Sequence, residues 1–359
     1  MVGLISQPQE SQPINNHHKL ETSMNSKVWA ATALVTTAAC AQAQSSVTIF
    51  GTLDASARSV TTGDTTVRQL GTDGLNNSRL GFKAEEDLGG GLRAGAWLES
   101  AINPDTGTIN ASGKFWHRRS TVSLFGPFGE VRVGRDLDAS FWNLSIFDPF
   151  GTCGVGSGFN LATNLGSGAA TLLRADNAIS YYLPPGLGGF YGQLEVAAGE
   201  GAPGNAYKGG RLGYSQGPLN TAIAYATTQT ATSDDFKVLN AGVSYNFGVA
   251  TAMALTNVAK YAAKKQTNWE AGLIVPVFGV GELKASYQRA NATGAGTDAN
   301  DAHQVAIGYV HNLSKRTALY GTYSQLTNDG NAAFVVGTPP AAAPGKASKG
   351  YEVGIRHFF

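Results

Sequence analysis

The amino-acid sequence predicts an all-β protein, a sixteen-stranded antiparallel transmembrane β-barrel. Apolar and polar residues alternate with a period of two over segments of about ten residues, and no convincing helical periodicity appears. Short Gly-rich turns alternate along the chain with longer polar connections. One face of the alternating segments is apolar and the other carries charge, which is the pattern expected when lipid lies on one side and water on the other.

The first 43 residues are expected to lie outside the barrel. Residues 24–43 combine one lysine, an apolar run and the sequence Ala41-Gln42-Ala43, the pattern of a secretory signal peptide with its cleavage site. The barrel domain is therefore expected at residues 44–359. A polar leader ahead of a signal peptide is unusual, so residues 1–23 are interpreted as a non-native upstream extension. Translation from Met24 is favoured on this basis, and a start at Met1 stays open.

The alternation is clearest in the first predicted strand, which contains SVTIFGTLDAS. Val47, Ile49 and Leu53 fall on one face, and Thr48 and Asp54 fall on the other. The segments SRLGFKAEE and GLRAGAWLES repeat the pattern. Strands that cross a bilayer at a tilt need about 9–11 residues, which matches the length of these segments.

The connections give the strand number. Seven short turns alternate with eight longer connections, so fifteen connections join sixteen strands and leave both termini on one side. A β-sandwich would also give alternating strands, but it explains neither their length nor a face that carries charge. Sixteen strands enclose an aqueous channel rather than a packed core. The longer connections are expected at residues 59–75, 104–114, 136–173, 200–205, 231–235, 262–266, 291–300 and 327–348.

Aromatic residues near strand ends predict girdles at the two membrane interfaces. The tyrosines expected there are Tyr181, Tyr214, Tyr245, Tyr309, Tyr320 and Tyr323. The last segment, YEVGIRHFF, alternates in the same way, so its odd-numbered residues from Tyr351 to Phe359 are expected to face lipid. This strand should pair with the first strand, at Val47, to close the barrel.

Several arginines fall on the face that is predicted to line the lumen. Arg79 is out of phase with the apolar residues of its strand, and so are Arg132 and Arg174. In the segment WHRRSTVSL, strict alternation points Arg119 inward. Arginine keeps its charge when it is crowded by other cations, which suits a basic pore lining.

Acidic residues in the same region could oppose these arginines. Glu99 falls on the lumenal face, and Asp136, Asp138 and Asp148 belong to the longest connection, 136–173. A long connection in a compact domain is usually functional. Fixed charges in a narrow pore with low-dielectric walls act strongly on passing ions, and basic side chains favour anions. Because acids are few in this connection, the sequence predicts a preference for anions.

Other functions receive little support from the sequence. Positive and negative residues are nearly balanced, 26 against 25, so binding to nucleic acid is not expected. No motif for a cofactor or a metal is present, and we expect none to be bound. The segment GYSQG matches the nucleophile motif G-x-S-x-G, but it lies at a predicted strand end before a turn, without the required strand–turn–helix context. A reaction is therefore not predicted.

The chain resembles a known family along its whole predicted barrel. SVTIFGTLDAS, SRLGFKAEEDLGGGLRAGAWLES, RRSTVSLFGPFGEVRVGRD, NAISYYLPPGLGGF, YVHNLSKRTALYGTYS and the final VGIRHFF resemble the general porins of Gram-negative bacteria, in particular the β-proteobacterial branch. The resemblance implies homotrimers of barrels in the outer membrane, each with its third extracellular loop folded into the lumen. It also implies a basic cluster at the positions of Arg79, Arg118 and Arg174, and a sorting signal for the outer-membrane assembly machinery at Phe359. The family pattern thus favours Arg118 where alternation favours Arg119; a β-bulge would reconcile the two, and both residues stay candidates. Lipopolysaccharide and other outer-membrane lipids are expected as neighbours.

The sequence and the resemblance together predict a channel for passive diffusion of small hydrophilic solutes and ions, with a preference for anions. Two alternatives remain: a porin specific for an organic acid or phosphate, and, with little support, an outer-membrane barrel enzyme.

Overall fold

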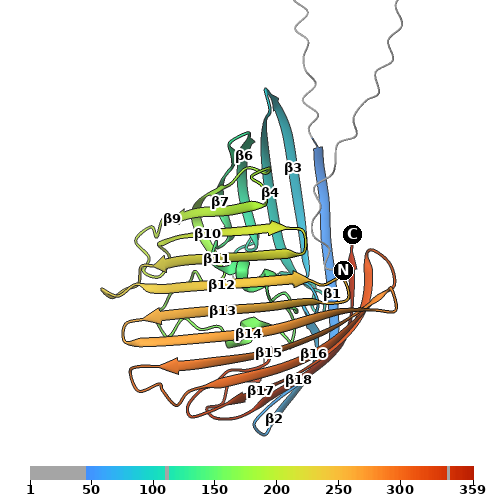
Figure 1. Ribbon diagram of the computed structural model, residues 1–359, viewed down its shortest axis with the longest axis vertical. Coiled ribbons are helices and arrows are strands. Elements are labelled where there is room, and N and C mark those ends of the chain that lie inside the picture. Colours follow the sequence, from blue (N-terminus) through green and yellow to red (C-terminus); the bar gives the residue numbers. More distant parts are fainter. Residues whose placement is uncertain (1–45, 110–112, 338–339) are drawn as a thin grey trace, which may run out of the picture. The chain divides into compact units, whose positions relative to one another are not determined.

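A computed structural model describes residues 46–109, 113–337 and 340–359 of the chain (Figure 1). The predicted upstream extension, residues 1–23, and the predicted signal peptide, residues 24–43, lie outside the described residues and stay predictions. In the described parts, neither of the two short helical segments has the length or the apolar character needed to cross a membrane.

Almost all regular structure is antiparallel sheet. The strands are β1 (Ser46–Thr62), β2 (Thr65–Thr72), β3 (Arg79–Gly89), β4 (Leu92–Asn103), β5 (Thr108–Ile109), β6 (Arg119–Gly126), β7 (Gly129–Leu137), β8 (Arg174–Tyr182), β9 (Phe190–Ala197), β10 (Tyr207–Gln216), β11 (Leu219–Thr228), β12 (Phe236–Asn246), β13 (Thr251–Tyr261), β14 (Lys264–Val277), β15 (Gly281–Thr293), β16 (Ala302–Asn312), β17 (Thr317–Asn328) and β18 (Ser348–Phe358).

Sixteen of these strands form a closed barrel, as the sequence predicted. Each strand of the ring pairs with its neighbours, and β1 closes the ring by pairing with β3 on one edge and with β18 on the other. The remaining two strands are not part of the ring. β2 folds back and pairs with the C-terminal half of β1, and the two-residue β5 pairs with the end of β4. Closure satisfies the backbone polar groups that lipid could not.

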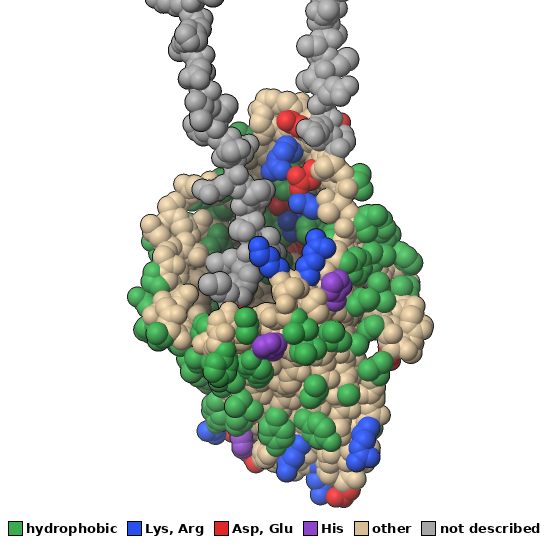
Figure 2. All heavy atoms as spheres, turned by 90° about the vertical axis from the view of Figure 1, so that its right-hand side faces the viewer, with side chains coloured by type: hydrophobic (Ala, Val, Ile, Leu, Met, Phe, Trp, Pro, Cys, Tyr) green, Lys and Arg blue, Asp and Glu red, His purple; other side chains and the backbone are tan. Residues whose placement is uncertain are grey.

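The predicted alternation is seen in the burial of the side chains. On β1, Ile49 and Leu53 are exposed on the outside while Thr52 and Asp54 are buried on the inside. Figure 2 shows one face of the molecule, where hydrophobic side chains cover the outer flank and charged side chains gather in a hollow. The outside is therefore the apolar, lipid-facing surface, and the polar groups lie towards the lumen.

Barrel closure differs in register from the prediction. Val47 pairs with Ala84 of β3, not with the last strand. Pairing with β18 begins further along β1, where Phe359 exchanges backbone hydrogen bonds with Gly51 and Phe358 lies opposite Thr52. The strands of a barrel are staggered around its wall, so the rim is not level and the first residues of β1 extend past the last residue of β18. The outward row Tyr351 to Phe359 is nevertheless exposed, as predicted.

Two predicted connections are more ordered than expected. Residues 59–75 hold the end of β1 and all of β2, which form a hairpin instead of an open loop. Residues 262–266 reduce to a tight turn, because Tyr261 of β13 already pairs with Lys264 of β14. Both segments have polar sequences, and polarity alone does not separate a solvated hairpin from a loop.

One tyrosine expected in the aromatic girdles points the other way. Tyr320 on β17 is 3% exposed, and its hydroxyl donates a hydrogen bond to Asp54 inside the barrel. Tyr245 and Tyr323 are exposed on the outside, as predicted. Tyr320 lies on the same face of β17 as Thr322 and the buried Ser324, which point into the barrel. Its position in the strand, and not its being a tyrosine, therefore decides that it faces inward.

The connection between β7 and β8 runs along the inner wall. It contains α1 (Phe141–Ile146), which lies against β11, β12 and β13, and the 3-10 turn η1 (Gly158–Leu161) near β15 (Figure 1). Asn240 of β12 donates to the Ser140 carbonyl, and Gln304 of β16 donates to the Ser157 carbonyl. Both wall residues are fully buried and face inward. These contacts are those expected of a loop that enters the lumen.

Candidate functional site in the lumen

Three arginines meet around one carboxylate on the inner wall. Arg118, just before β6, donates from its Nε to Glu99 Oε1 of β4 at 2.6 Å. Arg79, the first residue of β3, has its Nε 3.9 Å from the same oxygen. Arg174, the first residue of β8, donates from its Nε to the Arg118 carbonyl oxygen at 2.8 Å. Glu99 pairs with Arg79 and Arg118 but not with Arg174, so one carboxylate faces three cations and the cluster keeps a net positive charge.

The pKa of His117 shows that the electrostatic potential beside this arginine cluster is positive. Burial lowers the pKa of the His117 imidazole, and the positive charges of Arg118, Arg174 and Arg135 lower that pKa further. The last of these arginines was not predicted as a site residue. Several cations therefore act on one point, which is the arrangement that raises the local concentration of anions.

Arg118 and Arg119 both point inward, which resolves the choice that the sequence left open. Arg119 is the first residue of β6, and its guanidinium lies 4.3 Å from the ring centre of the inward-facing Trp97. Arg118 precedes the strand, so the alternation of β6 does not constrain it. The irregularity in this region lies in the neighbouring strand β7, where the register shifts between Gly134 and Asp136.

Arg132 lies inward, as predicted, but it is largely neutralised. Its guanidinium donates to Glu130 at 2.8 Å and 2.9 Å and to Asp136 at 2.6 Å. It also stacks 4.1 Å from the ring centre of Tyr182. Asp136 belongs to β7 and not to the connection that follows it. Arg132, Glu130 and Asp136 therefore form an ion-paired cluster on the inner wall. It lies next to Arg79, Arg118 and Arg174, which have fewer carboxylate partners.

The two remaining acids are buried and do not face open solvent. Asp138 is fully buried, and neither of its carboxyl oxygens has a hydrogen-bond partner among the described residues. Asp148 accepts backbone hydrogen bonds from Phe150, Thr152 and Gly158, at 2.8 Å each. Burial raises the pKa of both carboxyl groups above their ordinary value.

At least five further basic residues reach the inner wall and were not predicted from the sequence. Each lies in the inward phase of its strand or beside the β7 irregularity, so the alternation could have identified most of them. Arg58 is bound to Glu352 at 2.7 Å and Arg135 to Asp176 at 2.7 Å. The five residues are Arg58, Arg135, Arg211, Lys284 and Arg356.

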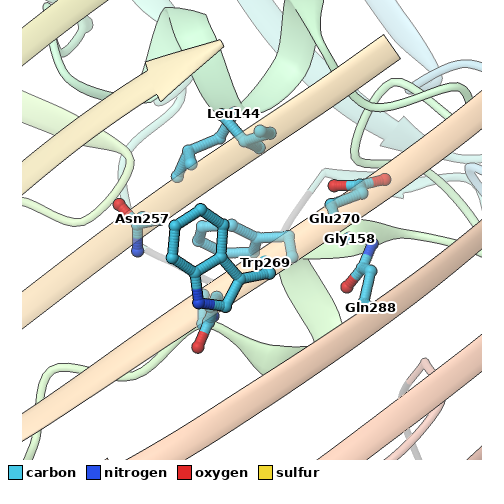
Figure 3. A pocket seen from close by; sticks show the side chains of 10 residues that line it. Leu144, Gly158, Asn257, Trp269, Glu270 and Gln288 are labelled. Carbon is cyan, nitrogen blue, oxygen red and sulfur yellow. The ribbon is translucent and has the colours of Figure 1, made fainter. Parts of the chain in front are cut away.

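The loop from β7 to β8 packs closely on the wall because two wall residues are glycines. A Cβ atom at Gly242 would lie 2.1 Å from the Phe147 ring, and one at Gly272 would lie 2.2 Å from Pro149. A small pocket remains between the loop and β13–β15, where Glu270 and Gln288 lie near Gly158 (Figure 3). These contacts hold the loop against the side of the barrel and leave little space behind it.

Comparison with known proteins agrees with the fold and with the sequence motifs. A family model described as Gram-negative porin matches residues 30–331. The chain belongs to the Gram-negative porin family. This porin is 40% identical over 353 residues to outer membrane porin protein 32 of Delftia acidovorans, a match that covers 92% of this chain and 98% of the relative. It is 26% identical to an outer membrane porin of Bordetella pertussis, covering 94% of this chain and 100% of the relative.

A solved structure supports the same assignment. The anion-selective porin from Comamonas acidovorans superposes on this porin with a TM-score of 0.81 at 39% sequence identity, covering 88% of this chain and all of that structure. OmpT of Vibrio cholerae, at 14% identity and a TM-score of 0.66, shares the fold. The porin is therefore an outer-membrane channel of the β-proteobacterial type that the sequence motifs predicted.

Proposed function

We propose that this porin lets small hydrophilic solutes diffuse passively and prefers anions among them. The observation that carries the proposal is the cluster of Arg79, Arg118 and Arg174 around the single carboxylate of Glu99. Its net positive charge lies on the inner wall, where low-dielectric surroundings strengthen its effect on passing ions. The name of the Comamonas porin, which is called anion-selective, supports the same direction.

Reversal potentials across a salt gradient test this proposal. We expect the wild-type channel in a planar bilayer to favour chloride over potassium, and Arg79→Gln together with Arg174→Gln to reduce that preference. Arg289→Gln is a matched control, because Arg289 lies on the outside and pairs with Asp301. Cation preference in the wild-type channel, or no change in the double variant, would refute the proposal.

The loop between β7 and β8 is proposed to form the constriction beside these arginines. Its hydrogen bonds to Asn240, Gln304 and Glu352 run from β12 to β18 on the inner wall. Deletion of residues 141–161 should raise the single-channel conductance. Unchanged conductance in a correctly folded deletion variant would place the constriction elsewhere.

A homotrimer is proposed as the assembled state, with the β1–β8 side as the subunit interface. On the described strands, exposed aromatic side chains occur only from β9 to β18, for example at Tyr225, Trp269 and Tyr351. Beyond Leu53, the outward row of β1 instead carries the small residues Ala55 and Ala57. Small side chains suit a flat protein contact, whereas aromatic girdles suit lipid. Ala57→Arg should reduce the heat-stable oligomer on a gel.

Contacts with lipopolysaccharide and recognition of Phe359 by the assembly machinery remain proposals.

A further inference from the structure

Two buried carboxyl groups meet where the β7–β8 loop leaves the wall. Asp138 is the first residue after β7, and Glu195 lies on the inner face of β9. The backbone N–H of Ala139 donates to Glu195 Oε2 at 3.1 Å, so the two acids are close neighbours. Asp138 is fully buried and Glu195 is 3% exposed. Two acidic groups therefore share a site that bulk water does not reach.

Most oxygens of these side chains have no hydrogen-bond donor. Neither oxygen of Asp138 has a partner among the described residues, and Oε1 of Glu195 has none either. Gln193, two residues before Glu195 on the same face of β9, donates from its Nε2 to Glu195 Oε2 at 2.7 Å. Gln193 is itself 3% exposed, and its Oε1 has no partner. Four buried acceptor oxygens on three adjoining side chains are thus left without a donor, which is rare and unfavourable in a folded protein.

The nearest arginines bind other groups. Burial and the charge of Glu195 raise the pKa of Asp138. The charges of Arg174 and Arg135 oppose that rise, but neither arginine forms an ion pair with this carboxyl group. Arg174 donates to a backbone carbonyl at 2.8 Å, and Arg135 pairs with Asp176 at 2.7 Å. The positive charge that neutralises the two acids must therefore come from a proton or from a bound cation.

The oxygens suit a metal ion better than a proton. One proton can join at most two of the four oxygens, whereas a metal ion can bind all of them. Within the described ranges, no three His, Cys, Asp or Glu side chains are grouped as a metal site, so the third ligand here is the amide of Gln193. Carboxylate and amide oxygens are the ligands of hard cations. Ca²⁺ accepts an irregular shell of them completed by water, while Mg²⁺ requires near-ideal octahedral geometry.

We propose that Asp138, Glu195 and Gln193 bind a calcium ion that fastens the base of the β7–β8 loop to β9. Two carboxylates balance the charge of one divalent cation. Because the loop enters the lumen directly after Asp138, a link at this residue fixes the point at which the loop leaves the wall. The site contains none of the arginines that surround Glu99, so the inference does not depend on the ion preference of the pore.

Calcium binding is tested on porin that has been refolded without native lipid, since lipids of the outer membrane also bind calcium. The full chain is unfolded in urea with EDTA and refolded in detergent with calcium or with magnesium, and folding is checked by heat-shifted gel mobility. Calcium retained after gel filtration is counted by elemental mass spectrometry. The main variant carries Asp138→Asn and Glu195→Gln, which preserve the size of both side chains. A milder variant, Gln193→Leu, keeps both carboxylates.

Glu270→Gln is the matched control, because Glu270 is also a buried acid of the inner wall but lies on β14 near the far part of the loop. We expect about one calcium ion per chain in the wild type and in this control. The main variant should retain at most about a tenth as much, and Gln193→Leu should bind calcium several-fold more weakly. Calcium should also raise the unfolding temperature of the wild type and leave that of the main variant unchanged.

Three results would overturn the proposal. The first is a refolded wild type that retains no calcium, which decides the matter even if the main variant fails to fold. The second is equal calcium content in the wild type and Gln193→Leu together with an equal content in the main variant. The third is loss of calcium from the Glu270→Gln control, which would place the ion at the other end of the loop. Equal retention of magnesium and calcium would refute the assignment to calcium.

Discussion

The ring of Phe359 lies directly over Gly51, and the two residues exchange backbone hydrogen bonds of 3.1 Å in each direction. A Cβ atom at Gly51 would lie 2.2 Å from the ring. The seam between the first and last strands therefore depends on a glycine that leaves space for an aromatic side chain at the membrane surface.

Substitution at this seam should weaken closure. Gly51→Ala must displace the Phe359 ring, and overpacking of this kind costs about 1–3 kcal/mol. Deletion of Phe359 removes both hydrogen bonds and should lower the yield of heat-stable oligomer on a gel. Gly321→Ala is the control, since its Cβ would have 3.7 Å of clearance on the same outer surface. Wild-type yield from the Phe359 deletion would contradict this expectation.

The buried pair Arg58–Glu352 should be needed to hold the loop in the lumen. Glu352 binds the guanidinium of Arg58 at 2.7 Å and accepts a hydrogen bond from the backbone of Val155 at 3.0 Å. Glu352→Ala would leave a buried arginine without its partner, at a cost of about 3–5 kcal/mol. The predicted result is a lower unfolding temperature in detergent and noisier single-channel currents. If both stay at wild-type values, the pair does not anchor the loop.

The loop should dock more firmly at low pH. Burial raises the pKa of Asp148 above its ordinary value, so the docked loop holds a proton that the unfolded chain releases. The stability contribution of this group is largest below pH about 4. It falls by about 1.4 kcal/mol for each pH unit between the pKa of the unfolded chain and the raised pKa of the folded one. Midpoints of thermal unfolding between pH 4 and 8 should show this decline.

Removal of a neighbouring carboxylate should weaken that pH dependence. A Cβ atom at Gly158 would lie 2.8 Å from Glu270 and 3.2 Å from Asp148, so both carboxyl groups approach the same glycine. Glu270→Gln removes one negative charge, and its unfolding midpoint should change less with pH than that of the wild type. An unchanged or steeper pH dependence would contradict this expectation.

Cys153 should be inert in the folded porin. Burial raises the pKa of the Cys153 thiol to about 12, and Asn77 contacts its sulfur at 3.3 Å. Because the thiolate is the reactive form, a water-soluble thiol reagent should react at least about a hundredfold more slowly than with urea-unfolded protein. Cys153→Ser, which removes the thiol of the barrel domain, is the control for labelling elsewhere. Rapid labelling with a fall in conductance would instead place Cys153 on the ion path.

The sequence could not predict how the arginines of the inner wall are paired. The alternation assigns Arg79, Arg132 and Arg174 to the lumenal face, and in the structure they contact Glu99, Asp136 and the Arg118 carbonyl, respectively. It gave no sign that Arg132 is enclosed by Glu130 and Asp136, while Arg79 and Arg118 share Glu99. These ion pairs depend on which strands are neighbours in the barrel and on the register shift in β7. Neither is encoded in the alternation of adjacent residues.

Alternation along the chain was enough to specify the barrel, because a period of two assigns every strand residue to lipid or to water wherever the wall is continuous. The contacts between distant segments emerged only from the folded chain: Phe359 over Gly51, Phe147 over Gly242, and Lys237 opposite Lys260. The two kinds of information differ in range. Alternation is a property of adjacent residues, whereas register and loop docking follow from closing the whole sheet into a ring.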